Sequence, residues 1–265
     1  MKKHIKNTRF GGIYLFTTMD IKQYLDSTYL KTPEQASLTK EENKKIVEGF
    51  IHEAIEENFK LIMIRPDMVL LARNIIDAAV SKVLVGTVID FPEGKSNLQS
   101  KIAEAEKAIE DGADDLDFVC NYEAFKAGEI DLVKNEVLEC TRLGLKHNKT
   151  VKWIIEIAAL NDQQIVRLSA LIKNVILSNF KEELYSCVFV KSSTGFYKTE
   201  NDKPNGATLP AIIMMLENAS PLPIKAAGGV RTLEEAQEMI KLGVKRIGTS
   251  SAKAIARGNV GKENY

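Results

Sequence analysis

Two lysines lie in apolar segments that are each followed by a turn of small residues. Lys191 closes the run Val-Phe-Val-Lys, and Lys225 lies inside the run Pro-Ile-Lys-Ala-Ala. A lysine at a strand end can extend its ammonium group into solvent, so either lysine alone has an ordinary structural explanation. Two lysines at matching positions of consecutive segments favour a chemical role. Burying an ammonium group costs on the order of several kcal/mol unless it is paired or neutralised.

A pair of buried lysines is one way to make a nucleophilic amine. An amine attacks a carbonyl only when uncharged, and a lysine with an ordinary pKa of ~10.4 is uncharged in about one molecule in a thousand near pH 7.4. Burial and a second ammonium group lower that pKa, together by up to ~3 units. Neighbouring strands lie about 4.8 Å apart, which is near enough for strong coupling. Lys191 and Lys225 therefore predict imine (Schiff-base) chemistry.

A carboxylate that moves protons would complete such a site. The run Ala-Asp-Asp-Leu-Asp-Phe-Val places Asp115 and Asp117 on the same face of a predicted strand. Asp117 stands between leucine and phenylalanine, and we expect it to lie deeper. Its structural explanation is an ion pair with a buried lysine. That explanation and an acid–base role are compatible, because the same contact serves both.

An anion site is predicted after two consecutive strands. Gly228 and Gly229 follow one strand, the run Gly-Thr-Ser-Ser at 248–251 follows the next, and both lead into helix starts. Backbone N–H groups and the helix dipole bind phosphate at such places. Either motif alone is weak, since Ser250 and Ser251 are equally ordinary helix N-caps. The prediction depends on their paired placement, because phosphate sites recur after strands 7 and 8 of (β/α)₈ barrels.

Short aliphatic runs alternate with amphipathic stretches at a period of roughly 30 residues, which is typical of βαβ units. The predicted strands are 24–26, 60–64, 82–89, 115–119, 151–157, 187–191, 223–227 and 245–248. Among the helices, 99–110 shows an apolar stripe, and 232–242 begins with a Thr232–Glu235 capping box and stops at Gly243. Eight such units predict an α/β fold, a single-domain (β/α)₈ barrel. An open doubly wound sheet is the alternative, but no GxGxxG motif follows the first strand.

Composition limits the classes of function. The 265 residues carry a net charge of zero and no basic stripe, so we expect neither a nucleic-acid partner nor a global field that steers anions. The three cysteines and three histidines lack metal-ligand spacing, which favours reduced thiols, no metal and a cytoplasmic location. No apolar stretch approaches the ~18–20 residues of a membrane span. We expect residues 1–19 to be an N-terminal extension, disordered or not the native start, before a barrel domain at 20–265.

Four segments together resemble the deoxyribose-phosphate aldolase family of class I aldolases. The resemblance runs from about Tyr24 to Ile255. The segments are Tyr-Leu-Asp-Ser-Thr-Tyr-Leu-Lys at 24–31, Gly-Ala-Asp-Asp-Leu-Asp at 112–117, Val-Lys-Ser-Ser-Thr-Gly-Phe at 190–196 and Ile-Lys-Ala-Ala-Gly-Gly-Val-Arg-Thr at 224–232. The resemblance implies a carbon–carbon lyase that cleaves 2-deoxy-D-ribose 5-phosphate reversibly to acetaldehyde and D-glyceraldehyde 3-phosphate. It also implies that no cofactor or metal is needed and that the partner is a small phosphosugar.

The resemblance also implies a role for each site residue. Lys191 corresponds to the imine-forming lysine, Lys225 to the partner that lowers its pKa, and Asp117 to the relay acid. Asp26 belongs to the same polar network, and Thr28 contacts a substrate hydroxyl. The other residues implied to bind the substrate, chiefly its phosphate, are Thr194, Gly195, Gly228, Gly229, Ser250 and Ser251.

Two departures and two alternatives stay open. Met63 stands where several family members have cysteine, and the loop 197–205 is long and charged; both bear on specificity. The alternatives are a Schiff-base barrel aldolase for another phosphorylated substrate, and a barrel that only binds or isomerises sugar phosphates. An intact set of Lys191, Lys225 and Asp117 argues against a binder, which needs no neutral amine. A homodimer is considered, but no sequence feature fixes the oligomeric state.

Overall fold

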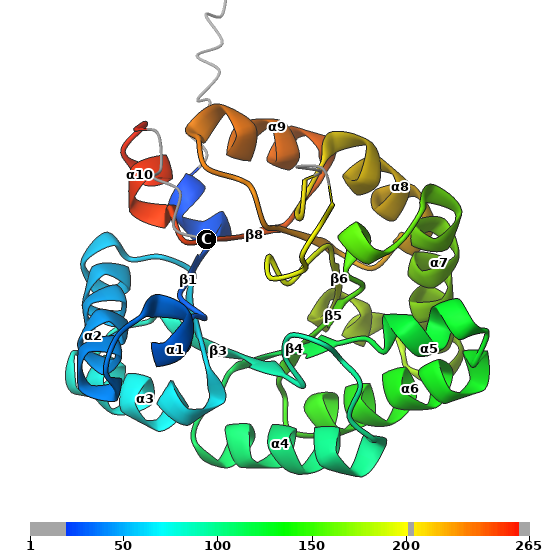
Figure 1. Cartoon of the computed structure of the whole chain (residues 1–265), viewed down its shortest axis with the longest axis horizontal. Helices are drawn as coiled ribbons and strands as arrows, with labels where there is room; N and C mark the ends of the chain where they lie inside the picture. The colour runs from blue at the N-terminus through cyan, green and yellow to red at the C-terminus, as the bar shows by residue number, and fades with distance from the viewer. Residues whose placement is uncertain (1–19, 201–203, 260–265) are drawn as a thin grey trace, which may run out of the picture.

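The computed structural model describes residues 20–200 and 204–259, and it forms a closed barrel ringed by helices (Figure 1). Its eight strands are parallel, pair in sequence order, and close through the pairing of β8 with β1. This closure confirms the (β/α)₈ prediction over an open sheet. The strands are β1 (Leu25–Thr28), β2 (Leu61–Ile64), β3 (Leu84–Ile89), β4 (Asp115–Val119), β5 (Thr150–Ile154), β6 (Val188–Lys191), β7 (Ile224–Ala227) and β8 (Arg246–Thr249). The extension predicted at 1–19 lies outside the described residues.

Helices connect the strands and cover the outside of the barrel (Figure 1). They are α1 (Pro33–Ala36), α2 (Lys40–Glu57), α3 (Val69–Ala78), α4 (Leu98–Glu110), α5 (Tyr122–Ala127), α6 (Ile130–Lys146), α7 (Asp162–Asn179), α8 (Leu209–Ala219), α9 (Leu233–Leu242) and α10 (Ala252–Ala256). Four short 3₁₀ helices are Ile21–Tyr24, Pro66–Met68, Ile157–Ala159 and Glu182–Cys187. The predicted capping box of α9 is present: the Thr232 hydroxyl accepts from the Glu235 N–H, and the Glu235 carboxylate accepts from the Thr232 N–H, both at 3.1 Å. Across the described residues, no helix has the length and apolarity to cross a membrane.

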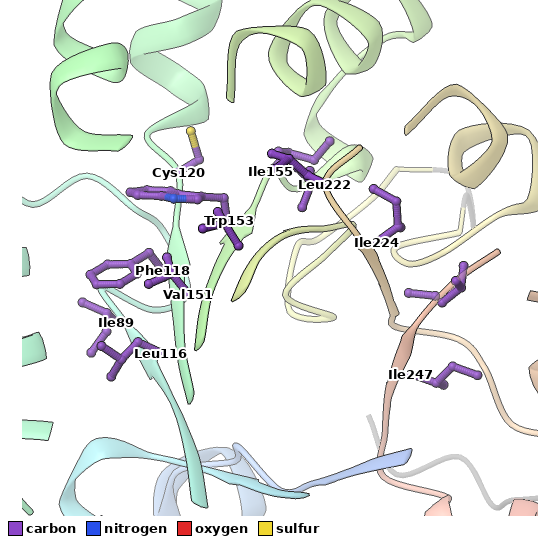
Figure 2. Packing of buried hydrophobic residues seen from close by; sticks show 14 of the residues in the cluster. Ile89, Leu116, Phe118, Cys120, Val151, Trp153, Ile155, Leu222, Ile224 and Ile247 are labelled. Carbon is purple, nitrogen blue, oxygen red and sulfur yellow. The ribbon is translucent and has the colours of Figure 1, made fainter. Parts of the chain in front are cut away.

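The main apolar core lies between the strands and the surrounding helices. Figure 2 shows part of it, with side chains from β4, β5, β7 and β8. Phe118 stacks on Trp153 with ring centroids 5.2 Å apart, and the indole N–H of Trp153 donates to the Thr141 hydroxyl at 3.0 Å. Successive strand residues point to opposite faces of the sheet. Because one set of side chains packs against the helices, the alternate set points into the barrel.

The alternate set of side chains is divided between apolar and charged residues. On the β2–β3 side, Leu61, Met63 and Val88 form a small buried cluster with Leu30. The side chains of β4 to β8 and β1 that enter the barrel include the charged residues described below. Met63 is fully buried in this cluster and does not line the cavity described below.

One predicted strand is too long. The range 151–157 was expected to be extended, but β5 ends at Ile154. Glu156 has φ 54° and ψ 70°, a left-handed conformation that a strand cannot continue through. Its carboxylate instead accepts hydrogen bonds from the N–H and hydroxyl of Thr194. The chain turns here because Glu156 bonds to the segment after β6.

Two helical glycines should respond oppositely to alanine. A Cβ on Gly144 of α6 would lie 2.3 Å from Cγ2 of Val151, whereas a Cβ on the exposed Gly49 of α2 would have nothing within 4 Å. We expect Gly144→Ala to lower the free energy of unfolding by about 1–3 kcal/mol, since overpacking outweighs helix propensity. Gly49→Ala should raise it by up to ~1 kcal/mol. Urea denaturation measures both, and equal effects of the two changes would contradict this packing of α6 on β5.

Candidate active site

A cavity of about 130 Å³ opens at the carboxyl end of the barrel strands. Lys191, Thr28 and Thr249 are the last residues of β6, β1 and β8, and all three line it. In Figure 1 the segment after β6, in yellow, projects onto the barrel opening, and Thr194, Gly195 and Asn205 of this segment line the cavity. The lining residues are Thr28, Leu30, Lys191, Thr194, Gly195, Asn205, Ala227, Gly228, Gly229, Val230, Arg231, Gly248, Thr249 and Ser250. This is the end of the barrel at which enzymes of this fold carry their sites.

The predicted lysines and aspartate meet below this cavity. Lys191 and Lys225 are register partners on β6 and β7. Their Nζ atoms lie 2.9 Å and 2.8 Å from the same oxygen, Oδ2 of Asp117. Lys225 and Asp117 are fully buried, and Lys191 is 3% exposed. The structure therefore brings the three residues together and leaves Lys191 as the one of them that lines the cavity.

Lys191 is prepared to act as an uncharged amine. Burial, together with the ammonium groups of Lys225 and Lys152, lowers its pKa to about 8, although its contact with Asp117 acts in the opposite direction. At pH 7.4 a group with this pKa is uncharged in about a fifth of molecules, against about one in a thousand for an ordinary lysine. The amine is thus roughly two hundred times more available as a nucleophile.

Asp117 is held as a carboxylate. Burial by itself would raise its pKa, but the ammonium groups of Lys152, Lys191 and Lys225 keep it well below the usual range. Lys152 Nζ lies 2.7 Å from Oδ1, so both carboxylate oxygens accept hydrogen bonds. Asp117 can accept a proton from a neighbouring amine but does not carry one at rest.

Glycine turns form the rim of the cavity. Gly195, Gly228 and Gly229 all have φ near +80°, a backbone conformation that other residues adopt only with strain. A Cβ on Gly206 would lie 2.3 Å from the carbonyl carbon of Gly228, so the two backbones touch. The Ala207 N–H donates to the carbonyls of Ala227 and Gly228. These contacts hold the turns after β6 and β7 against each other, so that backbone lines the cavity.

The remaining predicted residues divide between the cavity and its surroundings. Thr28, Thr194 and Ser250 line the cavity, whereas Asp26 lies below it and Ser251 beside it. The Ser251 N–H already donates to the Thr249 hydroxyl at 3.0 Å, and α10, which follows, has five residues. A helix this short sums few peptide dipoles, so the predicted helix-dipole contribution is small here. A role of Ser251 in phosphate binding stays a prediction.

Comparisons with known proteins decide the family. A model of the DeoC/LacD family of aldolases matches residues 22–260. The chain belongs to the DeoC/LacD aldolase family. It is similar to the deoxyribose-phosphate aldolase of Thermococcus gammatolerans, with 36% identity over 91% of this chain and 96% of that one. It is also 36% identical to that of Streptococcus gordonii, over 93% of this chain and 100% of the other.

A solved structure agrees with the family assignment. The deoxyribose-phosphate aldolase of Aeropyrum pernix, described as a tetramer, has a TM-score of 0.72 and 25% identity to this chain, over 89% of each.

Sequence reasoning missed three charged residues in this DeoC/LacD aldolase. Lys152 ion-pairs with Asp115 at 2.6 Å as well as with Asp117. Arg246 lies 2.5 Å from Asp26, and Glu156 binds the backbone after β6. The signal was present for Lys152, which interrupts an apolar strand, whereas Arg246 follows Lys245 at the start of β8 and gives no such signal. Among the described residues, no three His, Cys, Asp or Glu side chains gather as metal ligands would.

Removing Lys225 should make Lys191 an ordinary lysine again. Lys225→Met deletes a cation next to Lys191 and gives Asp117 one ammonium group fewer to share, so we expect the pKa of Lys191 to rise from about 8 by roughly one to two units. Competitive labelling with acetic anhydride across pH, followed by peptide mapping, measures this pKa. The exposed Lys245→Met is the control and should leave it unchanged. An unshifted pKa in folded Lys225→Met would reject the coupling.

Proposed function

We propose that this chain is a class I aldolase that cleaves 2-deoxy-D-ribose 5-phosphate reversibly to acetaldehyde and D-glyceraldehyde 3-phosphate through an imine on Lys191. Family membership supports the reaction class, and the names of the similar proteins support the substrate. The observation that carries the proposal is the position of Lys191. Of the barrel lysines in the described chain, Lys191 lines the cavity, while Lys152 and Lys225 lie below it.

The chemistry follows from a neutral amine at the cavity floor. The Nζ lone pair of Lys191 attacks the C1 aldehyde of the open-chain sugar, and loss of water leaves a protonated imine. Loss of the proton from the C3 hydroxyl lets the C2–C3 bond break, and its electron pair moves into the imine to form an enamine. Glyceraldehyde 3-phosphate leaves. Protonation of the enamine at C2 and hydrolysis release acetaldehyde and restore Lys191.

Asp117 is proposed to relay protons in these steps. Its Oδ2 lies between the amines of Lys191 and Lys225, so a proton released during imine formation has an acceptor within 3 Å. The low pKa of Asp117 means that it takes this proton only briefly and returns it to the carbinolamine or the enamine. Lys225 is proposed to serve as the neighbouring cation that lowers the pKa of Lys191.

The rim is proposed to hold the phosphate. Gly195, Gly228 and Gly229 bring backbone to the cavity, and Ser250 adds the start of the segment after β8. Thr28 and Thr194 line the same cavity and are proposed to contact the sugar. A substrate anchored by its phosphate at the rim would direct its aldehyde carbon down towards Lys191. Asp26 and Ser251, which do not line the cavity, would act through their neighbours.

Two further predictions belong to this proposal. A reducing, cytoplasmic location is supported by Cys120, Cys140 and Cys187, which are all unpaired. A homodimer stays a prediction that light scattering of the purified chain can check.

The alternative of an aldolase for another phosphorylated substrate shares the Lys191 chemistry and would differ in the aldehydes released.

Covalent trapping tests the proposal directly. Acetaldehyde at limiting concentration with borohydride should add one two-carbon group to Lys191, because that amine is uncharged at neutral pH far more often than an exposed lysine. Peptide mapping identifies the residue, and Lys191→Met is the control that should take up no such group. A coupled assay should detect glyceraldehyde 3-phosphate from deoxyribose 5-phosphate with chelator present. An adduct mapped to Lys152 or Lys225 would overturn the assignment.

A carboxylate at the rim should discriminate between substrates. Ser250→Glu would set a negative charge against the phosphate, and two like charges about 4–5 Å apart cost on the order of 3 kcal/mol in a partly dehydrated site. We expect kcat/KM for deoxyribose 5-phosphate to fall about a hundredfold. The uncharged Ser250→Gln should have a much smaller effect. For deoxyribose without phosphate, kcat/KM of the Ser250→Glu variant should fall little. Equal losses of kcat/KM for both sugars would place the phosphate elsewhere.

A further inference from the structure

The ion pairs inside the barrel join into a closed ring. From Asp117 Oδ1 the ring passes to Lys152 (2.7 Å), to Asp115 (2.6 Å) and to Arg246 (3.3 Å). It continues to Asp26 (2.5 Å) and Lys225 (2.6 Å), and returns to Asp117 at Oδ2 (2.8 Å). Acidic and basic side chains alternate at every step. The members come from β4, β5, β8, β1 and β7, and the most exposed of them, Arg246, is 6% exposed.

The ring is electrically balanced without Lys191. Among the described residues, its three carboxylates, Asp26, Asp115 and Asp117, meet three cations, Lys152, Lys225 and Arg246. Lys191 is a fourth cation, attached to the Asp117 oxygen that already accepts from Lys225. A protonated Lys191 therefore gives the buried cluster a net positive charge, and a neutral Lys191 removes it. An unbalanced charge in a buried site is costly, so the balance favours the neutral amine.

Outside the ring, Glu156 interacts electrostatically with Lys191 and Arg231 lines the same cavity, and neither residue is a member of the ring. β2 and β3 face the interior with apolar residues, among them Leu61, Met63 and Val88. Beyond β5, Glu156 interacts electrostatically with Lys191, but its carboxylate accepts from the N–H and hydroxyl of Thr194. Burial raises the pKa of Glu156, the hydrogen bonds with Thr194 lower it, and Lys191 lowers it less than those hydrogen bonds do.

Arg246 is the ring member that forms ion pairs with both Asp26 and Asp115, the two carboxylates other than Asp117. Its guanidinium donates to Asp26 and to Asp115, and it does not line the cavity. Burial would lower the pKa of Arg246, but Asp26 and Asp115 raise it, so the group stays charged. The pKa of Asp26 is lowered by Arg246 and Lys225 against the effect of burial, which would raise it. Both ends of this link are therefore ions.

We propose that Arg246 is a positioning residue for the imine-forming amine. By pairing with Asp26 and Asp115, it leaves the already shared Asp117 as the ring carboxylate that contacts Lys191, and so favours the uncharged form of Lys191 without touching the substrate. The inference rests on the proposed function in one respect, that Lys191 is the nucleophile. Without the guanidinium the ring carries a net negative charge, which a proton on Lys191 would balance. Without the Asp115 carboxylate the ring carries a net positive charge, which disfavours a proton on Lys191.

The test compares two opposite charge changes and their combination. The rate of reductive ethylation of Lys191 by acetaldehyde and cyanoborohydride is followed from pH 6 to 9.5, normalised to the exposed Lys44 in the same sample. The wild-type midpoint should lie near 8. Arg246→Met should move it up by about one unit, and Asp115→Asn should move it down by a similar amount. The double variant restores the charge balance and should return the midpoint to within a few tenths of a unit of wild type.

Controls separate charge from damage to the fold. Arg246→Lys keeps the charge and should keep the wild-type midpoint, and thermal melting checks that each variant is folded. If Arg246→Met does not fold, Arg246→Gln takes its place and should show the same upward shift. Folded single variants with unshifted midpoints, or a double variant shifted further than either single one, would overturn the proposal. Absence of an ethyl group on wild-type Lys191 would instead reject the proposed function.

Discussion

One carboxylate, that of Asp117, accepts hydrogen bonds from three buried ammonium groups, and the rest of the site depends on this contact. Removing it would leave Lys152, Lys191 and Lys225 without their common counterion, which is strongly destabilising for buried charges. A single negative charge cannot balance three positive ones. The shortfall falls on Lys191, because Lys152 and Lys225 each have a second carboxylate, Asp115 and Asp26.

The closed parallel barrel is what allows this sharing. The partners of Asp117 lie 35, 74 and 108 residues away in the sequence. The strand register sets Asp117 beside Lys152 and Lys191 beside Lys225, with Lys191 two residues beyond Phe189, the partner of Lys152 on β6. Packing around Lys225 is also close. A Cβ on Gly248 would lie 3.1 Å from Cε of Lys225, so the glycine on β8 leaves room for that side chain to reach Asp26 and Asp117.

The sequence predicted the fold class and the meeting of Lys191, Lys225 and Asp117, but not the ring of ion pairs around them. Strand spacing, glycine turns and the α9 capping box depend on local chemistry, and local chemistry is visible in a sequence. Lys152 interrupts an apolar strand and Arg246 follows Lys245 at the start of one, but a strand has two faces, and nothing local says which one points into the barrel. The end of β5 was missed for a related reason. Glu156 leaves the strand conformation to bond Thr194, a residue that is distant along the chain.

A phosphate bound at the rim of the cavity affects Lys191 at its floor in opposite ways before and after the imine forms. A phosphate dianion near Lys191 raises the pKa of the free amine and so works against the first step. The same dianion stabilises the protonated imine, which carries a positive charge on the same nitrogen. An interaction speeds a reaction when it is stronger in the later, charged state than in the starting state. The phosphate disfavours the neutral amine but favours the cationic imine, so it drives the reaction forward once the bond forms. The cations of the ring act in the opposite direction to the phosphate, since with burial they lower the pKa of Lys191 to about 8 before the substrate arrives.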